Sequence, residues 1–314
     1  MTMELVRYLI EPRRWTTLPG RWEGVFGRRA PLAVEIGFGN GEFLVQAARQ
    51  HPDWDLLGFE LSLTCIAKAA SRLAREGLAN VRLARVDGRF ALRELFPDRS
   101  LTQVYVHFPC PWPKARHARR RLITPDFART LAAVLEIGGG FELNTDAQWY
   151  AYQAREALEA EGRFLVRGPW ALEGKGPGTR YERKWLGQGR KIFRVWAELR
   201  LPGSVERIAE GDMPHARVNV EVSREALLSL AGLKESWPGG AFMIKEVFLS
   251  PGGERALARA FSTDEGFEQH YLIALEKGWG GWLVKLDGAA VPFRTPAVKR
   301  SVAAVAAALE GKGP

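Results

Sequence analysis

The sequence predicts an α/β fold with a doubly wound, Rossmann-like parallel sheet, followed by a second, smaller α+β domain. Short apolar runs alternate with helical patterns from Leu32 to about Leu199, which is the pattern of successive βαβ units. A glycine-rich turn directly follows the first run and opens a helix, as at the ligand sites of such sheets. The 314 residues suit one domain of about 200 residues and a smaller one.

The elements of the main sheet follow each other closely along the chain. Its strands are expected at residues 32–36, 56–60, 81–86, 101–108, 141–144, 163–167 and 191–201. Helices are expected at 42–50, 62–76, 89–96, 125–136 and 147–160. Two of them begin with recognisable caps, because Ser62 is a typical N-cap residue and Thr124-Pro125 combines an N-cap with proline at the first helical position.

The smaller domain begins after a segment rich in proline and glycine. Its strands are expected at 217–222, 242–249, 271–275 and 280–286, and its helices at 224–231 and 295–309. The sequence therefore predicts four parts: an N-terminal extension (1–30), the main α/β domain (31–201), a linker (202–216) and a small α+β domain (217–314) of unassigned role.

Positive charge is concentrated in the first two thirds of the chain. The whole sequence has 45 Lys and Arg against 36 Asp and Glu, a net charge of +9. Residues 201–314 hold 13 basic and 14 acidic side chains, so residues 1–200 hold 32 and 22, a net of +10. This distribution favours a polyanionic partner such as nucleic acid, bound mainly by the first domain. A solubilising surface charge is the alternative.

Cysteine content and hydropathy point to the cytoplasm. Cys65 and Cys110 are the only cysteines, and two thiols without a framework of pairs suit a reducing compartment. Residues 1–19 lack a long apolar run and carry three arginines, unlike a signal peptide, and no other stretch is apolar enough to span a bilayer. The five histidines show no metal-ligand spacing with cysteine or acidic residues, so we expect neither membrane nor metal.

The glycine turn Gly37-Phe38-Gly39-Asn40-Gly41 predicts a nucleotide-type cofactor site. Glycines let the backbone pass close to a ligand and direct helix N–H groups at it. A dinucleotide-binding fold prefers G-x-G-x-x-G, but the position of its third glycine holds Glu42. An acidic residue there does not favour a pyrophosphate, so the sequence disfavours NAD.

Three acidic residues at strand ends favour S-adenosylmethionine instead. Glu60 follows Gly37 by 23 residues, where an acid binds ribose hydroxyls in such folds. Asp87 ends the third strand, where it can accept from an adenine amino group, and Glu35 precedes the turn, where a carboxylate suits an ammonium or sulfonium. We therefore predict that S-adenosylmethionine is bound by Glu35, Gly37, Gly39, Glu60 and Asp87. The alternative is that these acids only form turns.

A proline-stiffened aromatic loop, Phe108-Pro109-Cys110-Pro111-Trp112-Pro113-Lys114, follows the fourth strand, and a basic run (115–121) follows the loop. Methyltransferases hold the target atom at this place in the sheet. Lys114 can take a phosphate as a point charge, and Arg116 and its neighbours as guanidinium forks. A solvated charged face is the alternative. Trp112 either stacks on a flipped base or packs the loop.

These motifs together resemble the bacterial tRNA (guanine-N7-)-methyltransferase family over roughly residues 31–200. The matches are VEIGFGNGEFL (34–44), GFE (58–60), VDGR (86–89), HFPCPWPKARHARRR (107–121), LNTD (143–146) and GTRYERKWLGQGRKIFRVWAEL (178–199). The resemblance implies a class I S-adenosylmethionine-dependent methyltransferase domain that methylates N7 of the variable-loop guanine, position 46, of tRNA. It implies substrate contacts from Lys114, Asp146, Thr179, Arg180, Tyr181 and Glu182, and cofactor contacts from the three strand-end acids.

One residue departs from the family pattern, which has Asp where this chain has Cys110. That acid is the usual candidate for the catalytic residue. Guanine N7 already carries a lone pair and needs no general base, so alignment supplies much of the rate. A carboxylate helps by holding the guanine edge and balancing the charge that methylation leaves, whereas a thiol accepts only a weak hydrogen bond. We therefore expect Asp146, with Glu182 second, to carry more of this task.

Three alternatives remain at this stage. Cys110 is either a weak catalytic contact or a small packing residue. A covalent thiolate mechanism, as in C5-pyrimidine methyltransferases, is disfavoured because N7 needs no activation of the ring. For the protein as a whole, one alternative is a methyltransferase of the same fold that acts on another RNA or on a small molecule. Another is a tRNA-binding protein without catalysis.

Overall fold

The computed structural model describes residues 3–172, 178–209 and 212–311, and the chain forms two compact units. The first unit comprises Met1–Pro12 and Pro19–Glu206, and the second comprises Arg13–Leu18 and Arg207–Pro314. Contacts with Phe293 and Arg294 connect the segment Arg13–Leu18 to the rest of the second unit. The guanidinium of Arg294 donates to the carbonyl of Trp15 at 2.6 Å, and that of Arg13 lies 5.8 Å from the centre of the Phe293 ring.

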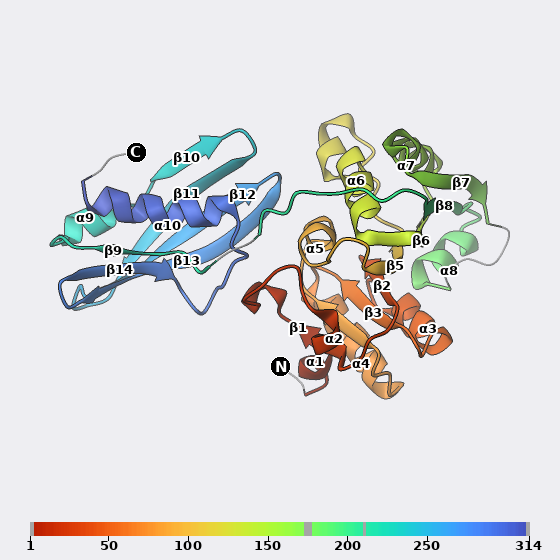
Figure 1. Cartoon of the computed structure of the whole chain (residues 1–314), viewed down its shortest axis with the longest axis horizontal. Coiled ribbons are helices and arrows are strands. Elements are labelled where there is room, and N and C mark those ends of the chain that lie inside the picture. Colours follow the sequence, from red (N-terminus) through yellow and green to blue (C-terminus); the bar gives the residue numbers. More distant parts are fainter. Residues whose placement is uncertain (1–2, 173–177, 210–211, 312–314) are drawn as a thin grey trace. The chain divides into compact units, whose positions relative to one another are not determined.

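An eight-stranded sheet forms the centre of the first unit (Figure 1). The unit's elements in chain order are α1 (Met3–Tyr8), β1 (Leu9–Ile10), α2 (Trp22–Phe26), β2 (Leu32–Ile36), α3 (Glu42–Gln50), β3 (Asp55–Phe59), α4 (Leu63–Arg75), β4 (Val81–Ala84), α5 (Gly88–Glu94), β5 (Leu101–His107), η2 (Ala115–Arg120), α6 (Pro125–Val134), β6 (Leu135–Thr145), α7 (Gln148–Glu161), β7 (Phe164–Ala171), α8 (Arg180–Gly187) and β8 (Phe193–Leu199), with the 3-10 turn η1 (Pro12–Arg14) where the chain leaves the unit. The strand order is β1-β4-β3-β2-β5-β6-β8-β7.

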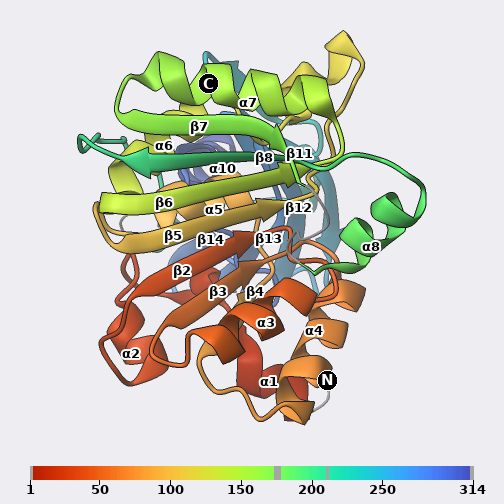
Figure 2. The same ribbon diagram turned by 90° about the vertical axis from the view of Figure 1, so that its right-hand side faces the viewer.

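The sheet is parallel from β1 to β6, and β8 runs antiparallel to both β6 and β7. Figure 2 shows α3 in front of the sheet and α5 and α6 behind it. Every residue of β2 and β3 is buried, as expected for strands covered on both faces. The predicted α/β class is therefore confirmed, and so are the two predicted caps: Ser62 Oγ accepts from Cys65 N, and Thr124 Oγ1 from Phe127 N.

The strand order reverses direction at β2, whose neighbours are β3 and β5. In open parallel sheets, a crevice forms outside the carboxyl ends of the strands at such a point. The carboxyl ends of β2, β3 and β5 carry Glu35, Glu60 and His107 respectively. The topology therefore gathers these titratable side chains, from three separate parts of the sequence, around one crevice.

The second unit is a six-stranded antiparallel sheet with helix α10 packed on one face (Figure 1). Its elements are β9 (His215–Val218), α9 (Arg224–Leu228), β10 (Lys234–Trp237), β11 (Gly240–Leu249), β12 (Arg255–Asp264), β13 (Phe267–Gly278), β14 (Gly281–Leu286) and α10 (Pro296–Leu309), and the strand order is β10-β11-β12-β13-β14-β9. Tyr271 and Trp282 of the sheet pack with Val302 of α10 in its core.

Several elements differ from the prediction. Strands β10 and β12 were not predicted from the sequence. The strand expected at 217–222 corresponds to β9, which spans His215–Val218. Strand β12 turns Ala256, Ala258 and Ala260 inward, and alanine is a poor strand former that carries almost no apolar signal. The predicted extension also contains structure, because Tyr8 of α1 is fully buried and its hydroxyl donates to Leu78 O at 2.8 Å.

The described residues offer neither a membrane-spanning helix nor a cluster of metal ligands. In residues 3–172, 178–209 and 212–311, no helix combines the length and the apolar character that a membrane crossing requires. The same residues contain no group of three or more His, Cys, Asp and Glu side chains placed to hold a metal ion.

Candidate cofactor and substrate site

The glycine turn between β2 and α3 brings bare backbone to the crevice. Gly37, Gly39 and Gly41 have φ angles of 75°, 53° and 73°, in the left-handed region that favours glycine. A Cβ atom at Gly37 or Gly39 would face open space, whereas one at Gly41 would lie 2.6 Å from Ala69 Cβ. The first two glycines thus expose the backbone to a ligand, and the third permits close packing of α3 on α4.

Glu60 fixes this turn from the end of β3. Its Oε2 atom accepts from Gly39 N at 3.1 Å, and its Oε1 atom accepts from the backbone N–H groups of Leu61 and Ser62 at 2.8 and 3.1 Å. Asp87 has a similar local role, because its Oδ1 atom accepts from Arg89 N and Phe90 N at the start of α5. The two carboxylates lie in one cavity, lined by Ile36, Gly37, Phe59, Glu60, Leu61, Val86, Asp87, Gly88, Arg89, Arg120 and Leu122.

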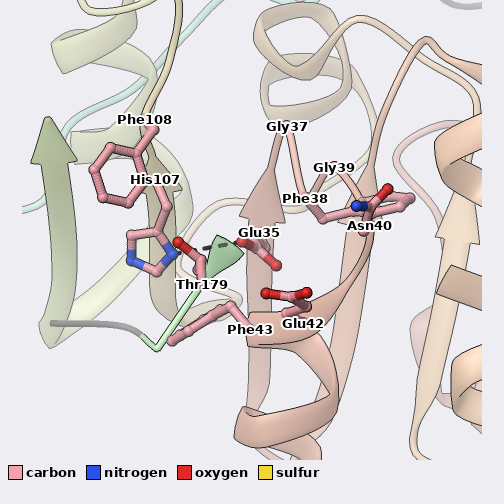
Figure 3. Close-up of a pocket in the computed structure, with 10 residues that line it drawn as sticks. All are labelled: Glu35, Gly37, Phe38, Gly39, Asn40, Glu42, Phe43, His107, Phe108 and Thr179. Carbon is pink, nitrogen blue, oxygen red and sulfur yellow. Dashed lines mark ion pairs between the residues drawn. The ribbon is translucent and has the colours of Figure 1, made fainter. Parts of the chain in front are cut away.

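Glu35 lies in the adjoining part of the crevice, against Phe43, His107 and Thr179 (Figure 3). Its side chain is only 3% exposed, and burial raises the pKa of the carboxyl against the opposing effect of His107. The Oε1 atom lies 3.4 Å from His107 Nδ1. The Oε2 atom is buried and has no hydrogen-bond partner among the residues that the structure describes. A buried oxygen without a partner beside a cavity is an acceptor available to a ligand.

His107 connects Glu35 to a second buried carboxylate. Its Nε2 atom lies 3.3 Å from Oε1 of Glu142, which also accepts from Asn144 Nδ2 at 2.6 Å and lies 3.7 Å from Arg194 Nε. Burial lowers the pKa of His107, but hydrogen bonds to the two carboxylates outweigh it, so the net shift is upward. Burial opposes ionisation of Glu142, yet the hydrogen bond and charge of His107 bring its pKa below the ordinary value. These groups form an ordered row of alternating charge.

The loop after β5 is held in a constrained conformation. Phe108 and Trp112 have φ angles of 53° and 48°, an unusual region for residues other than glycine, and one that persists only where the surroundings enforce it. The guanidinium of Arg121 donates to Trp112 O at 3.3 and 3.2 Å, and that of Arg120 lies 4.9 Å from the Trp112 ring centre. His117 meets the ring edge-on at 5.5 Å. Trp112 is therefore half-buried and fixed by its cationic neighbours.

Side chains that carry charge or sulfur project from this loop into solvent. Lys114 and Arg116 are exposed, and so is Cys110, a free thiol. The exposure of Cys110 does not fit the expectation of a small packing residue. The loop therefore presents a thiol and cations on a rigid support beside the crevice.

Comparison with known proteins shows which family the chain resembles. A family model described as a putative methyltransferase matches residues 29–195. The chain is 42% identical over 314 residues to the tRNA (guanine-N(7)-)-methyltransferase of Thermotoga maritima, covering 99% of both chains, and 36% identical to that of Thermus thermophilus, covering 97% of both. It is 40% identical to the enzyme so named from Alkalilimnicola ehrlichii over 174 residues, which is 54% of this chain and 73% of the relative.

The chain belongs to the tRNA (guanine-N(7)-)-methyltransferase family. The predicted resemblance is thus confirmed. The donor for this class of enzyme is S-adenosylmethionine, and the crevice fits it: glycine backbone faces open space, acceptors line one cavity, and a buried carboxylate oxygen lacks a partner in the described part of the chain. The predicted roles of Glu35 toward the ammonium group, Glu60 toward the ribose and Asp87 toward the adenine stay predictions.

In this methyltransferase, Asp146 stands just after β6 and is already paired. Its Oδ2 atom accepts from Arg190 Nη1 at 2.9 Å, and the Arg190 guanidinium also lies 4.1 Å from the ring centre of Trp185. The Asp146 side chain is 19% exposed, so it remains open to solvent on one side. The sequence-predicted substrate role of Asp146 stays a prediction, and Arg190 is its partner in the free enzyme.

The segment 178–182 of the methyltransferase is the start of helix α8, which the sequence analysis did not predict. Thr179 Oγ1 accepts from Glu182 N at 3.2 Å, while Glu182 Oε2 accepts from Gly178 N. The two bonds resemble a capping box in which Glu182 accepts from the residue before the cap, so the T-x-x-E spacing has a structural role in its own right. Thr179 also lines the pocket beside Glu35. The side chains of Arg180 and Tyr181, two predicted substrate contacts, lie outside the described residues.

The structure groups the predicted residues into two sets on one side of the sheet. The cofactor set and Thr179 line the crevice, whereas Cys110, Lys114 and Arg116 lie on the loop after β5. Sequence reasoning missed the role of Glu142, although an acidic residue inside the apolar strand β6 was a signal that it has a buried partner. It also missed the ion pair of 2.8 Å between Arg183 and Glu42, which ties α8 to α3.

Proposed function

We propose that this methyltransferase transfers the methyl group of S-adenosylmethionine to N7 of the variable-loop guanine, position 46, of tRNA, in the cytoplasm. Residues 31–201 are the methyltransferase domain in this proposal, and residues 217–314 are a separate domain that the proposal leaves without a role. The observation that carries it is the unpartnered Glu35 Oε2 atom, in a crevice that continues past Glu60 and Asp87 and opens beside the basic loop. Sequence identity to full-length relatives supports the choice of guanine N7.

The proposed chemistry needs little from the protein beyond placement. When bound, S-adenosylmethionine supplies an electrophilic methyl group on a sulfonium. Lys114 and Arg116 contact tRNA phosphates in this proposal, and Trp112 presents a ring on which a splayed base can stack. Asp146 holds the guanine edge and balances the positive charge that forms on the base. Thr179 lines the crevice from the α8 side, and the backbone N–H of Glu182 donates to its hydroxyl.

The test is incubation with methyl-labelled S-adenosylmethionine and unmodified tRNA transcript, followed by nucleoside mass spectrometry. We expect label in 7-methylguanosine, and none with a transcript in which guanine 46 is replaced by adenine. Label in another nucleoside would contradict the N7 assignment. Binding of S-adenosylmethionine without any transfer would favour the alternative of a tRNA-binding protein that lacks catalysis.

Replacement of Cys110 tests how much the thiol contributes. Because Cys110 is exposed and N7 needs no activation, Cys110→Asp is expected to retain the wild-type kcat or raise it by up to about tenfold, as a charge-assisted contact replaces a weak one. Cys110→Ala is expected to change kcat less than about threefold. Single-turnover methylation of tRNA measures both. Complete loss in both variants would instead indicate covalent thiol chemistry.

Glu60→Ala is expected to weaken binding of S-adenosylmethionine by about 30-fold or more, since it removes the proposed ribose acceptor and the group that fixes the turn at Gly39. Isothermal titration calorimetry measures the affinity. Glu76→Ala is the matched control, because its carboxylate pairs with Arg49 away from the crevice. Unchanged affinity in Glu60→Ala would refute the ribose role.

A further inference from the structure

The side chains of Glu35, His107, Glu142 and Arg194 form a row of alternating charge that ends at the proposed cofactor crevice. Glu35 (β2) and Glu142 (β6) flank His107 (β5) from opposite sides, with contacts of 3.4 and 3.3 Å to its two ring nitrogens. A neutral imidazole carries one N–H group, and only the imidazolium carries two. A histidine with a carboxylate oxygen at each nitrogen therefore favours the doubly protonated form.

The same contacts decide which oxygen of Glu35 is free. Oε1 lies at ion-pair distance, 3.4 Å, from His107 Nδ1, although the geometry there is not that of a hydrogen bond, and Oε2 is the buried carboxylate atom that lacks a partner among the described residues. Figure 3 shows the two side chains meeting at the pocket, with their ion pair drawn as a dashed line. Phe43 of α3 closes the arrangement, because its ring lies edge-on to His107 at 4.3 Å between centres. The imidazole has little room to turn, so the orientation of the carboxylate is fixed as well.

We propose that His107 is a positioning residue that keeps Glu35 ionised and holds its Oε2 atom ready for the ammonium group of S-adenosylmethionine. The proposal rests on the proposed function, since it assumes that this ligand occupies the crevice. Without a cation beside it, a carboxylate that is 3% exposed takes up a proton and no longer attracts an ammonium ion. The upward pKa shift of Glu35, which burial causes, shows how close this carboxyl lies to that state.

The surrounding charges balance the row. Arg194 of β8 lies 3.7 Å from Glu142, which keeps that carboxylate ionised and so favours the proton on His107. Burial raises the pKa of Tyr105, whose ring lies 5.8 Å from the imidazole, to about 12, so this phenol stays neutral. Glu60 acts on Glu35 by like-charge repulsion. A ligand ammonium ion therefore completes a row of alternating signs.

Binding of two related ligands to the full chain tests the proposal. S-adenosylhomocysteine keeps the amino-acid end of the donor, whereas 5′-methylthioadenosine shares its adenosine and sulfur but lacks that end. In His107→Phe we expect about tenfold weaker binding of S-adenosylhomocysteine at pH 8 and a further loss of up to tenfold for each pH unit below the pKa of Glu35. Binding of 5′-methylthioadenosine should stay within about twofold of wild type. In the wild type, both affinities should be nearly constant from pH 6 to 8.

Three further measurements make the result decisive. His107→Gln donates one hydrogen bond but carries no charge, so it should restore part of the affinity at pH 8 and keep the pH dependence. Tyr105→Phe is the matched control on the same strand and should behave as wild type. In wild-type protein with labelled histidine, NMR should show one imidazole, absent from His107→Gln, that titrates above 6.5.

Two outcomes would overturn the proposal. Equal losses for the two ligands would mean that His107 only supports the structure of the crevice, and a flat pH profile in His107→Phe would mean that it does not control the charge of Glu35. Neither outcome depends on methyl transfer, because no tRNA is present. Failure of the proposed function would instead appear as wild-type binding of S-adenosylhomocysteine without methylation of guanine 46.

Discussion

Asp146→Ala is expected to lower kcat for tRNA methylation by about 10²- to 10³-fold with little change in the affinity for S-adenosylmethionine. The exposed thiol of Cys110 cannot balance charge on the base, so Asp146 is the predicted carboxylate that remains for this task. Its effect belongs to the methyl-transfer step, because the positive charge appears on guanine only as the methyl group arrives. Single-turnover rates at saturating tRNA separate this effect from binding.

The pairing of Asp146 with Arg190 supplies the control for that experiment. Arg190 holds Oδ2 at 2.9 Å in the free enzyme, and its own side chain is about half exposed. Removing it with Arg190→Ala frees the carboxylate and is expected to change kcat less than about fivefold, since an exposed ion pair contributes little. Asp146→Asn keeps the shape and one acceptor oxygen but removes the negative charge that balances the charge on the base, so it should resemble Asp146→Ala. Wild-type kcat in Asp146→Asn would refute the assignment.

The parts of the fold that were predictable are those in which one local signal and the tertiary environment agree. Strand β2 is apolar because both of its faces are covered, and the caps at Ser62 and Thr124 satisfy backbone groups within three residues of themselves. Strand β12 failed this condition. Its inward residues Ala256, Ala258 and Ala260 are alanines, and their burial depends on α10 and the neighbouring strands, which the local sequence does not reveal.

The residues of the candidate site likewise fall into those that local sequence signals identify and those that only the folded sheet brings together. Gly37, Glu60 and Asp87 were identifiable because each stands at a strand end, and strand ends are visible in the sequence. The partnership of Glu35, His107 and Glu142 was not, because it depends on the lateral order of β2, β5 and β6 in the sheet. The T-x-x-E segment shows the converse limit. The resemblance identified it as a substrate contact, but only the hydrogen bonds of Thr179 and Glu182 reveal its capping role.

Glu35→Gln is expected to raise the Kd for S-adenosylmethionine by about 100-fold or more. The substitution removes the negative charge of Glu35, which is the charge that the ammonium group of the ligand would contact in the proposed complex. Calorimetric titration at pH 7.5 measures the change. The same variant is expected to unfold at the wild-type temperature or above it. Burial raises the pKa of Glu35, so its ionised form opposes folding near neutral pH, and a neutral amide avoids that cost.

Glu142→Gln is the matched control, because Glu142 flanks the same histidine but its pKa is lowered. A carboxyl whose pKa is lowered by folding stabilises the protein at pH values above its ordinary pKa of 4.5. This stabilisation is lost as the pH falls through the pKa of the folded state. At pH 7.5, Glu142→Gln should therefore lower Tm, by about 2–4 °C for each kcal/mol lost. Of the two amide substitutions on either side of His107, only Glu142→Gln is thus expected to lower Tm. A large fall in Tm for Glu35→Gln would mean that this carboxylate supports the fold rather than awaiting a ligand.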